Sequence, residues 1–147
     1  MRIYLAGSIF TPYERAFLDE CAARLRADGF DVFVPHEQKH LVGVDVTAEA
    51  VFAADAGGVE SADAVLAVLD GPAVDDGTAC EIGLFVGLKQ HDPGRKGVVG
   101  LLTDLRGERR GEFATNLFVR GCIESSGGAV VGTFDDALAI LRGWRSD

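Results

Sequence analysis

The segment best equipped for chemistry runs from Asp75 to Gly83 and has the sequence DDGTACEIG. It carries aspartates at its start and a glutamate, Glu81, at the head of an apolar run. Two carboxylates that flank one pocket can cleave a glycosidic bond, because one attacks or stabilises the anomeric carbon and the other serves the leaving group. Asp75 and Glu81 are therefore candidates for such chemistry.

The same segment also has a purely structural interpretation. Thr78 and Glu81 have the spacing of a capping box, in which the threonine hydroxyl caps a helix and the glutamate side chain reaches back to the cap amide. Asp75 and Asp76 would favour the positive end of the same helix. Spacing alone favours the cap for Glu81, because helix caps are far commoner than catalytic carboxylates.

Alternating strand and helix patterns must position these residues. Short apolar runs predict strands at residues 3–6, 31–34, 64–69, 97–102 and 129–131. Helical spacing predicts helices at residues 11–28, 47–59, 77–89 and 133–144, with a short one possible at 113–124. The first helix has a clear start in Thr11-Pro12-Tyr13-Glu14. The alternation indicates a single α/β domain over residues 1–147, a doubly wound (flavodoxin- or Rossmann-like) five-stranded parallel sheet with helices on both faces.

Ligands of such sheets bind outside the carboxyl ends of the strands, so the residues that follow the strands are the ones to weigh. They are Gly7 to Phe10, Pro35 to Gln38 and Asp70 to Asp76. The sequence has neither GxGxxG after the first strand nor GxxxxGK[ST], so no dinucleotide or P-loop site is predicted. His36 and His40 have helical spacing for a metal, but no third ligand accompanies them, and neither a metal nor another cofactor is predicted.

The charge balance restricts the partners. The chain has 14 basic and 23 acidic residues and a formal net charge of −9. Such a field repels phosphate backbones and anionic membranes, so neither a nucleic acid polymer nor a membrane is an expected partner. Three dispersed cysteines, without a CxxC pair, fit a reduced cytoplasm, and Cys80 is expected to be a small core residue.

Several segments taken together resemble the nucleoside 2-deoxyribosyltransferase family. They are the IYLAGSIF run from Ile3 to Phe10, Asp55 ahead of SADAVL, the DDGTACEIG segment, and Asn116-Leu117. The resemblance implies that Glu81 attacks C1′ of a 2′-deoxynucleoside and forms a covalent 2-deoxyribosyl-enzyme. It further implies that Asp75 contacts and helps to protonate the departing base, with Asp55 as a second base-side aspartate.

The resemblance also implies a set of binding residues. Tyr4 and Phe10 fall where aromatic side chains line the family's site, beside Gly7 and Ser8, and Gln38 falls near a base contact. Asn116 matches an asparagine that reaches the 5′-hydroxyl of a sugar bound by a neighbouring subunit. The expected protein is a homo-oligomer with shared sites that acts on deoxynucleosides and free purine or pyrimidine bases in nucleotide salvage.

Other interpretations remain open at this stage. Asp55 alone could be a solvated helix residue, and Tyr4 could simply pack in its strand. A 2′-deoxynucleoside 5′-phosphate N-hydrolase would use a similar glutamate, with Ser8 and Arg15 available near a phosphate. A non-catalytic nucleoside-binding regulatory domain could share the same fold.

Overall fold

The computed structural model describes residues 1–38, 46–105 and 115–146. Its strands are β1 (Arg2–Ala6), β2 (Asp31–Phe33), β3 (Ala64–Val68), β4 (Val98–Leu101) and β5 (Val130–Val131). Its helices are α1 (Pro12–Ala27), the 3-10 turn η1 (Pro35–Glu37), α2 (Ala48–Glu60), α3 (Asp76–His91), α5 (Leu117–Ser125) and α6 (Phe134–Ser146). Each predicted strand and helix is present, including the short helix that the sequence left open.

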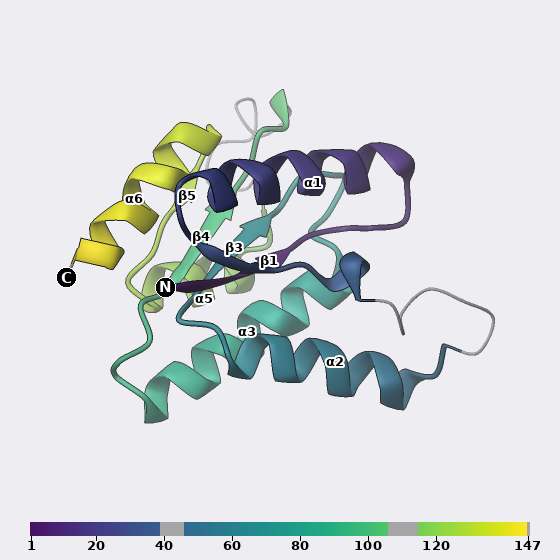
Figure 1. Ribbon diagram of the computed structural model, residues 1–147, viewed down its shortest axis with the longest axis horizontal. Coiled ribbons are helices and arrows are strands. Elements are labelled where there is room, and N and C mark those ends of the chain that lie inside the picture. Colours follow the sequence, from purple (N-terminus) through teal and green to yellow (C-terminus); the bar gives the residue numbers. More distant parts are fainter. Residues whose placement is uncertain (39–45, 106–114, 147) are drawn as a thin grey trace.

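All strand pairs are parallel, in the order β2-β1-β3-β4-β5 (Figure 1). This is the order of flavodoxin-like doubly wound sheets, so the predicted fold class is confirmed. The direction of winding reverses between β1 and β3. Ligands of this fold bind beside that switch point, at the carboxyl ends of the strands.

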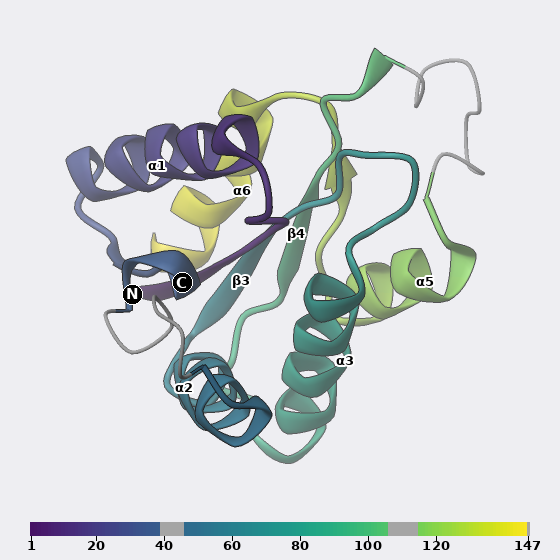
Figure 2. The same ribbon diagram turned by 90° about the vertical axis from the view of Figure 1, so that its right-hand side faces the viewer.

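The helices form a layer on each face of the sheet. Figure 2 shows α1 and α6 on one side and α2, α3 and α5 on the other. Along β1, Ile3 and Leu5 belong to the hydrophobic core under α1 and α6, whereas Tyr4 and Ala6 belong to the core under α2, α3 and α5. This alternation follows from the two-residue period of a strand, and it directs the Tyr4 side chain toward α2 and α3.

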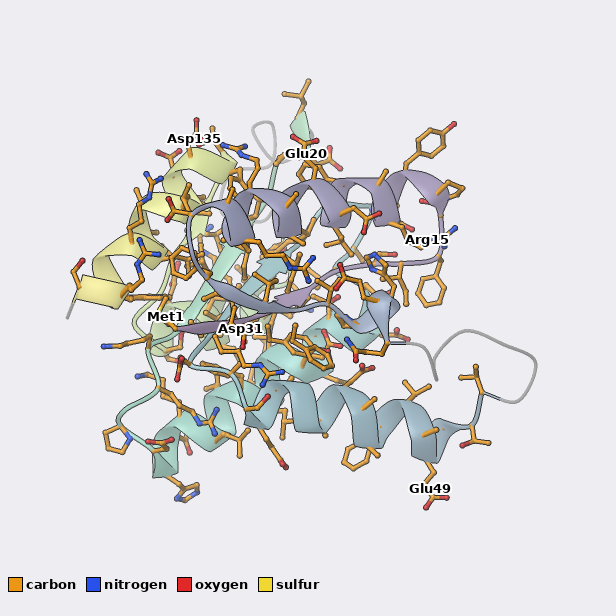
Figure 3. The ribbon with its side chains drawn as sticks, in the orientation of Figure 1. Met1, Arg15, Glu20, Asp31, Glu49 and Asp135 are labelled. Carbon is orange, nitrogen blue, oxygen red and sulfur yellow. The ribbon has the colours of Figure 1, made fainter. Side chains whose placement is uncertain are left out.

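The loop after β1 is held by contacts at the start of α1. The predicted capping box is present: Thr11 Oγ1 accepts from the amide of Glu14 at 3.2 Å, and the Glu14 carboxylate accepts from the amide of Thr11 at 2.7 Å. Arg15, labelled in Figure 3, donates from its guanidinium to the carbonyl of Ile9 at 2.6 Å. These contacts order the segment that follows β1.

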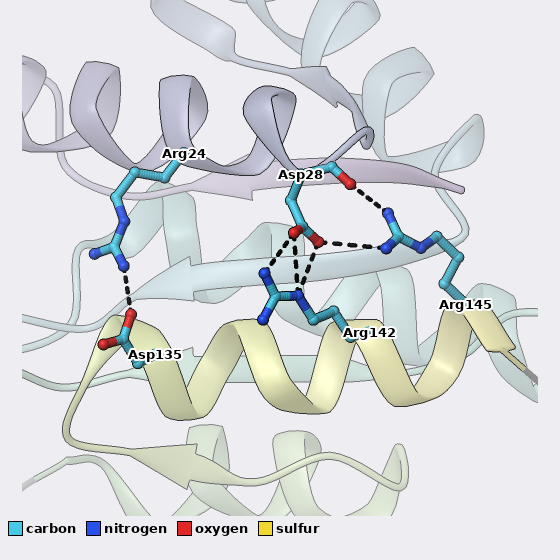
Figure 4. A network of polar contacts seen from close by, with 5 residues as sticks. All are labelled: Arg24, Asp28, Asp135, Arg142 and Arg145. Carbon is cyan, nitrogen blue, oxygen red and sulfur yellow. Dashed lines mark hydrogen bonds and ion pairs between the residues drawn. The ribbon is translucent and has the colours of Figure 1, made fainter.

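A polar network joins α1 to α6 at the far end of α1 from that loop (Figure 4). Asp28, the C-cap of α1, accepts from the guanidinium groups of Arg142 and Arg145, and Arg24 pairs with Asp135. The hydrogen bond from Arg142 lowers the pKa of Asp28. The network therefore fixes how α6 docks and lies away from the switch point.

Within the described residues, none of the helices has the length and apolar composition that crossing a membrane requires.

Candidate active site

Glu81 lies in the second turn of α3 and is not a capping residue. The N-cap is Asp75, whose carboxylate accepts from the amide of Thr78 at 3.1 Å. Thr78 is inside the first turn and only 1% exposed. The predicted Thr78–Glu81 capping box is therefore wrong, because α3 begins at Asp76 and its N-cap is Asp75. Glu81 contributes nothing to that cap.

The Glu81 carboxylate instead meets the phenol of Tyr4. The Tyr4 hydroxyl donates to Glu81 Oε1 at 2.6 Å, and Tyr4 is fully buried in β1. Tyr4 thus both packs in the core and contacts the candidate nucleophile. Burial, and then the charge and hydrogen bond of Glu81, raise the pKa of the Tyr4 hydroxyl, so it stays a hydrogen-bond donor.

The surroundings of Glu81 make its carboxylate costly to ionise. Burial is the main reason that its pKa rises to about 7. The hydrogen bond from Tyr4 acts in the opposite direction, while the negative charges of Asp55 and Asp75 raise the pKa further. A carboxylate that titrates near neutrality at the switch point of an α/β sheet is a candidate functional group.

Several of the predicted site residues line one cavity of about 320 Å³. Glu81 and Asp75 contribute from α3 and its cap, Asp55 from α2, and Gly7 and Phe10 from the loop after β1. Asp55 is half-buried, so it is not the freely solvated helix residue that its composition alone would suggest. The three carboxylates named from the sequence therefore share one cavity.

An apolar hollow of about 470 Å³ adjoins this cavity between α2 and α3. Glu81 and Asp55 line both. The remaining walls of the hollow are mostly apolar and are formed by Ala48, Val51, Phe52, Ala56, Val59 and Leu84. This apolar surface was not among the features predicted from the sequence. A usable signal was present, since Asp55 falls at helical spacing between Val51 and Val59 and so interrupts an apolar stripe.

Cys80 does not lie in the core, although its residue type predicted that it would. It is exposed and lines the apolar hollow next to Glu81. Position 80 faces α2 across the hollow, whereas Ile82 and Phe85 of the same helix are buried in the core. Which side of α3 faces the hollow depends on how the helix docks on the sheet. A single cysteine does not determine that docking.

Three predicted binding residues make other contacts in the structure. Ser8 lines a separate hollow of about 220 Å³ and hydrogen-bonds Glu14, which lowers the pKa of that carboxyl. Gln38 donates to the carbonyl of Val34 at 3.0 Å. Asn116 is the N-cap of α5 and accepts from the amide of Phe118 at 2.9 Å. None of the three is among the described residues that line the cavity around Glu81, and their predicted binding roles stay predictions.

Of the two histidines with helical spacing, the structure describes only His36. His36 Nε2 lies 2.7 Å from the carboxylate of Asp19, and His40 lies outside the described residues. Among the residues that the structure describes, no group of three or more His, Cys, Asp or Glu side chains could hold a metal ion.

Residues 3–129 match the family model described as nucleoside 2-deoxyribosyltransferase. The chain belongs to this family. No curated protein sequence matches it significantly. Among solved structures, a 2-deoxyribosyltransferase from Bacillus psychrosaccharolyticus matches with a TM-score of 0.70 and 26% identity, over 93% of this chain and 90% of that chain. The resemblance that the sequence suggested is thus confirmed.

Two further structures have the same architecture. A conserved protein from Enterococcus faecalis V583 matches with a TM-score of 0.81 and 25% identity, over 97% of this chain and 98% of that chain. A CMP N-glycosidase from Clostridium botulinum matches with a TM-score of 0.62 and 16% identity, over 98% and 99% of the two chains, which shows a shared fold alone. The family is an enzyme family of glycosyl transfer on nucleosides, and the geometry around Glu81 can be considered in that light.

Proposed function

We propose that this protein is a nucleoside 2-deoxyribosyltransferase that moves 2-deoxyribose between nucleobases through a covalent glycosyl-enzyme on Glu81. The observation that carries the proposal is the 2.6 Å hydrogen bond from buried Tyr4 to Glu81, in a cavity that Glu81 shares with Asp55 and Asp75. A desolvated, oriented carboxylate beside two more carboxylates has the parts that retaining transfer of a sugar needs.

The proposed reaction has two steps. In the first, a Glu81 oxygen bonds to C1′ while the N-glycosidic bond breaks and its electron pair leaves with the base. A base-side aspartic acid, Asp75 with Asp55 beside it, gives that base a proton. In the second step the incoming base loses a proton to the aspartate and its nitrogen bonds to C1′, which releases Glu81. Attack by water instead would give hydrolysis.

Tyr4 supports this chemistry in two ways. Its hydrogen bond fixes one Glu81 oxygen and leaves the other for C1′. It also offsets part of the cost of ionising a buried carboxylate, so that a substantial fraction of Glu81 is charged near neutral pH. We therefore assign Tyr4 as a residue that positions the nucleophile.

The charge of the cavity favours a neutral nucleoside over a nucleotide. Its described lining includes four acidic residues, Asp55, Asp75, Asp76 and Glu81, and no lysine or arginine. A 5′-phosphate would meet repulsion from these side chains, with no cation among the described lining residues to offset it. This supports the transferase over the 5′-phosphate N-hydrolase.

The proposed enzyme is a homo-oligomer in which Asn116 serves a neighbouring site. Asn116 begins α5, where Leu117 and Phe118 are 56% and 80% exposed. Neighbouring exposed apolar side chains of this size are often covered by another chain. Cys21, Cys80 and Cys122 are all free thiols, which fits the proposed location in a reduced cytoplasm.

The test is base exchange followed by chromatography. The purified protein is incubated with 2′-deoxyinosine plus adenine and, in parallel, with a 2′-deoxynucleoside 5′-monophosphate alone. Formation of 2′-deoxyadenosine by the natural chain but not by Glu81→Ala supports the proposal. Free base released only from the monophosphate would establish the hydrolase instead. Nucleoside binding without turnover would establish a regulatory domain.

A further inference from the structure

The ring of Tyr4 is held from the side by Phe33 of the neighbouring strand. In the parallel pair of β1 and β2, Tyr4 is the register partner of Phe33. Their ring centroids lie 5.3 Å apart with an interplanar angle of 14°, within the range of an offset stack. Phe33 lies in neither hollow that Glu81 lines. Phe33 contacts Tyr4, and through Tyr4 it has a direct route to Glu81.

Gly58 of α2 leaves the space that this stack occupies. A Cβ atom built on Gly58 would lie 2.6 Å from Cε1 of Phe33 and 2.8 Å from both Cδ1 and Cζ. The preceding residue, Gly57, offers a direct contrast because a Cβ there meets nothing within 4 Å. Of these two glycines, Gly58 has no room for a side chain and Gly57 does.

We propose that Gly58 and Phe33 form a positioning support for the active site, in which the bare Gly58 backbone lets Phe33 stack on Tyr4 and so aims the Tyr4 hydroxyl at Glu81. The inference rests on the proposed function for its catalytic meaning. The contacts themselves run without a gap from α2 through β2 and β1 to α3.

The distances indicate how sensitive the support is. An alanine at position 58 would start 2.6 Å from the Phe33 ring, and ordinary van der Waals contact begins at 3.4 Å, so the ring must move by about 0.8 Å. If Tyr4 moved by a similar distance along its hydrogen bond, the 2.6 Å separation would exceed the roughly 3.0 Å limit for O–H···O geometry. A small displacement of the ring is thus enough to lose the bond.

The consequence can be read from the ionisation of Glu81. The groups that face it are the Tyr4 hydroxyl from β1, the Asp55 carboxylate from α2 and the Asp75 carboxylate from the cap of α3. Tyr4 lowers the pKa of Glu81, and the two aspartates raise it. Weakening the Tyr4 bond leaves the aspartates unopposed, so the pKa of Glu81 must rise.

The experiment compares Gly58→Ala and Phe33→Leu with the natural chain and with Gly57→Ala. Gly57→Ala is the matched control, since it makes the same substitution on the same helix without the steric contact. The side-chain carboxyl of Glu81 is titrated by ¹³C NMR and assigned by its loss in Glu81→Gln. The pH profiles of kcat and KM for base exchange are measured on the same samples.

The expected result is a Glu81 pKa near 7 in the natural chain and in Gly57→Ala. Gly58→Ala and Phe33→Leu should raise it by roughly half a unit to one unit, part of what full loss of a hydrogen bond to a charged group would cause. The acidic limb of the kcat profile should move by the same amount, with KM little changed because Phe33 does not line the cavity. If Gly58→Ala does not fold, Phe33→Leu carries the test.

An unchanged Glu81 titration in Phe33→Leu would overturn the inference, even if turnover fell, because the loss would then come from general destabilisation. A rise in Gly57→Ala equal to that in Gly58→Ala would overturn it as well. The proposed function fails separately: a natural chain without base exchange at any pH could still show the shifted titration.

Discussion

Replacing Glu81 with glutamine should make the protein more stable while it removes the proposed nucleophile. Folding raises the pKa of Glu81 from 4.5 to about 7, chiefly through burial. Between these values the folded chain binds more protons than the unfolded chain, so the free energy of unfolding falls as the pH rises. The difference of about 2.5 units, at about 1.4 kcal/mol per unit, gives an upper value of about 3 kcal/mol for the cost of the charge above pH 7.

Glutamine has nearly the shape of glutamate and can still accept the Tyr4 hydrogen bond, but it carries no charge. Relative to the natural chain, Glu81→Gln should gain about 3 kcal/mol at about pH 8 and about 1 kcal/mol or less at about pH 5, from the same pKa difference. For a chain of this size the gain at the higher pH corresponds to a rise in Tm of roughly 6 to 12 °C. Base exchange should fall below detection.

The assay is urea unfolding of both proteins at the two pH values, with thermal unfolding as a second probe. Glu49→Gln is the control, because Glu49 is exposed in the first turn of α2, where Figure 3 shows it pointing away from the molecule. It should show no comparable gain that depends on pH. A Glu81→Gln variant that is less stable than the natural chain at about pH 8 would refute the argument and make Glu81 a structural residue.

Substitutions at three other residues separate the roles of the site residues. Tyr4→Phe removes the hydrogen bond that lowers the pKa of Glu81. The acidic limb of the pH profile of kcat/KM should therefore move upward by roughly one to two pH units. An unmoved limb would contradict this. Asp75→Asn should keep the N-cap of α3 but lose turnover. Asp75→Ala should lose turnover and also about 1 kcal/mol of unfolding free energy. Base exchange measures the turnover, and urea unfolding measures the stability. Asn116→Ala should weaken sugar transfer. If sites are shared between subunits, mixing Asn116→Ala subunits with Glu81→Gln subunits should restore part of the activity. Light scattering gives the oligomer size, and a monomer would exclude shared sites.

Local sequence signals were sufficient for the elements and for one helix cap. Within the described residues, the buried runs and helical spacings located the strands and the α-helices, with α5 left as a possibility, but not the 3-10 turn η1. Their periods of about two and 3.6 residues are properties of the backbone itself. Thr11 and Glu14 formed the predicted capping box because no competing cap stands beside them. The order of elements then restricts the chain to a doubly wound parallel sheet, because parallel strands need crossover connections.

The start of α3 was not decided by local sequence. Asp75, Asp76 and Thr78 are all good caps within a few residues, and their local preferences differ by too little to choose among them. Docking of α3 on the sheet buries Thr78, and the cap then falls on Asp75. The orientation in which α3 docks also exposes Cys80 beside the hollow and directs Glu81 toward Tyr4 of β1.

The sequence by itself determined the strands and the fold class, because these depend on residue type and on short-range periodicity. Its resemblance to the family named the candidate carboxylates. Only the tertiary structure decided that Glu81 meets Tyr4, a residue 77 positions away in the sequence, and that Gln38 hydrogen-bonds the carbonyl of Val34. A contact of that kind depends on strand register and on the angle at which each helix packs. Those quantities are set by the whole core at once, and no short segment encodes them.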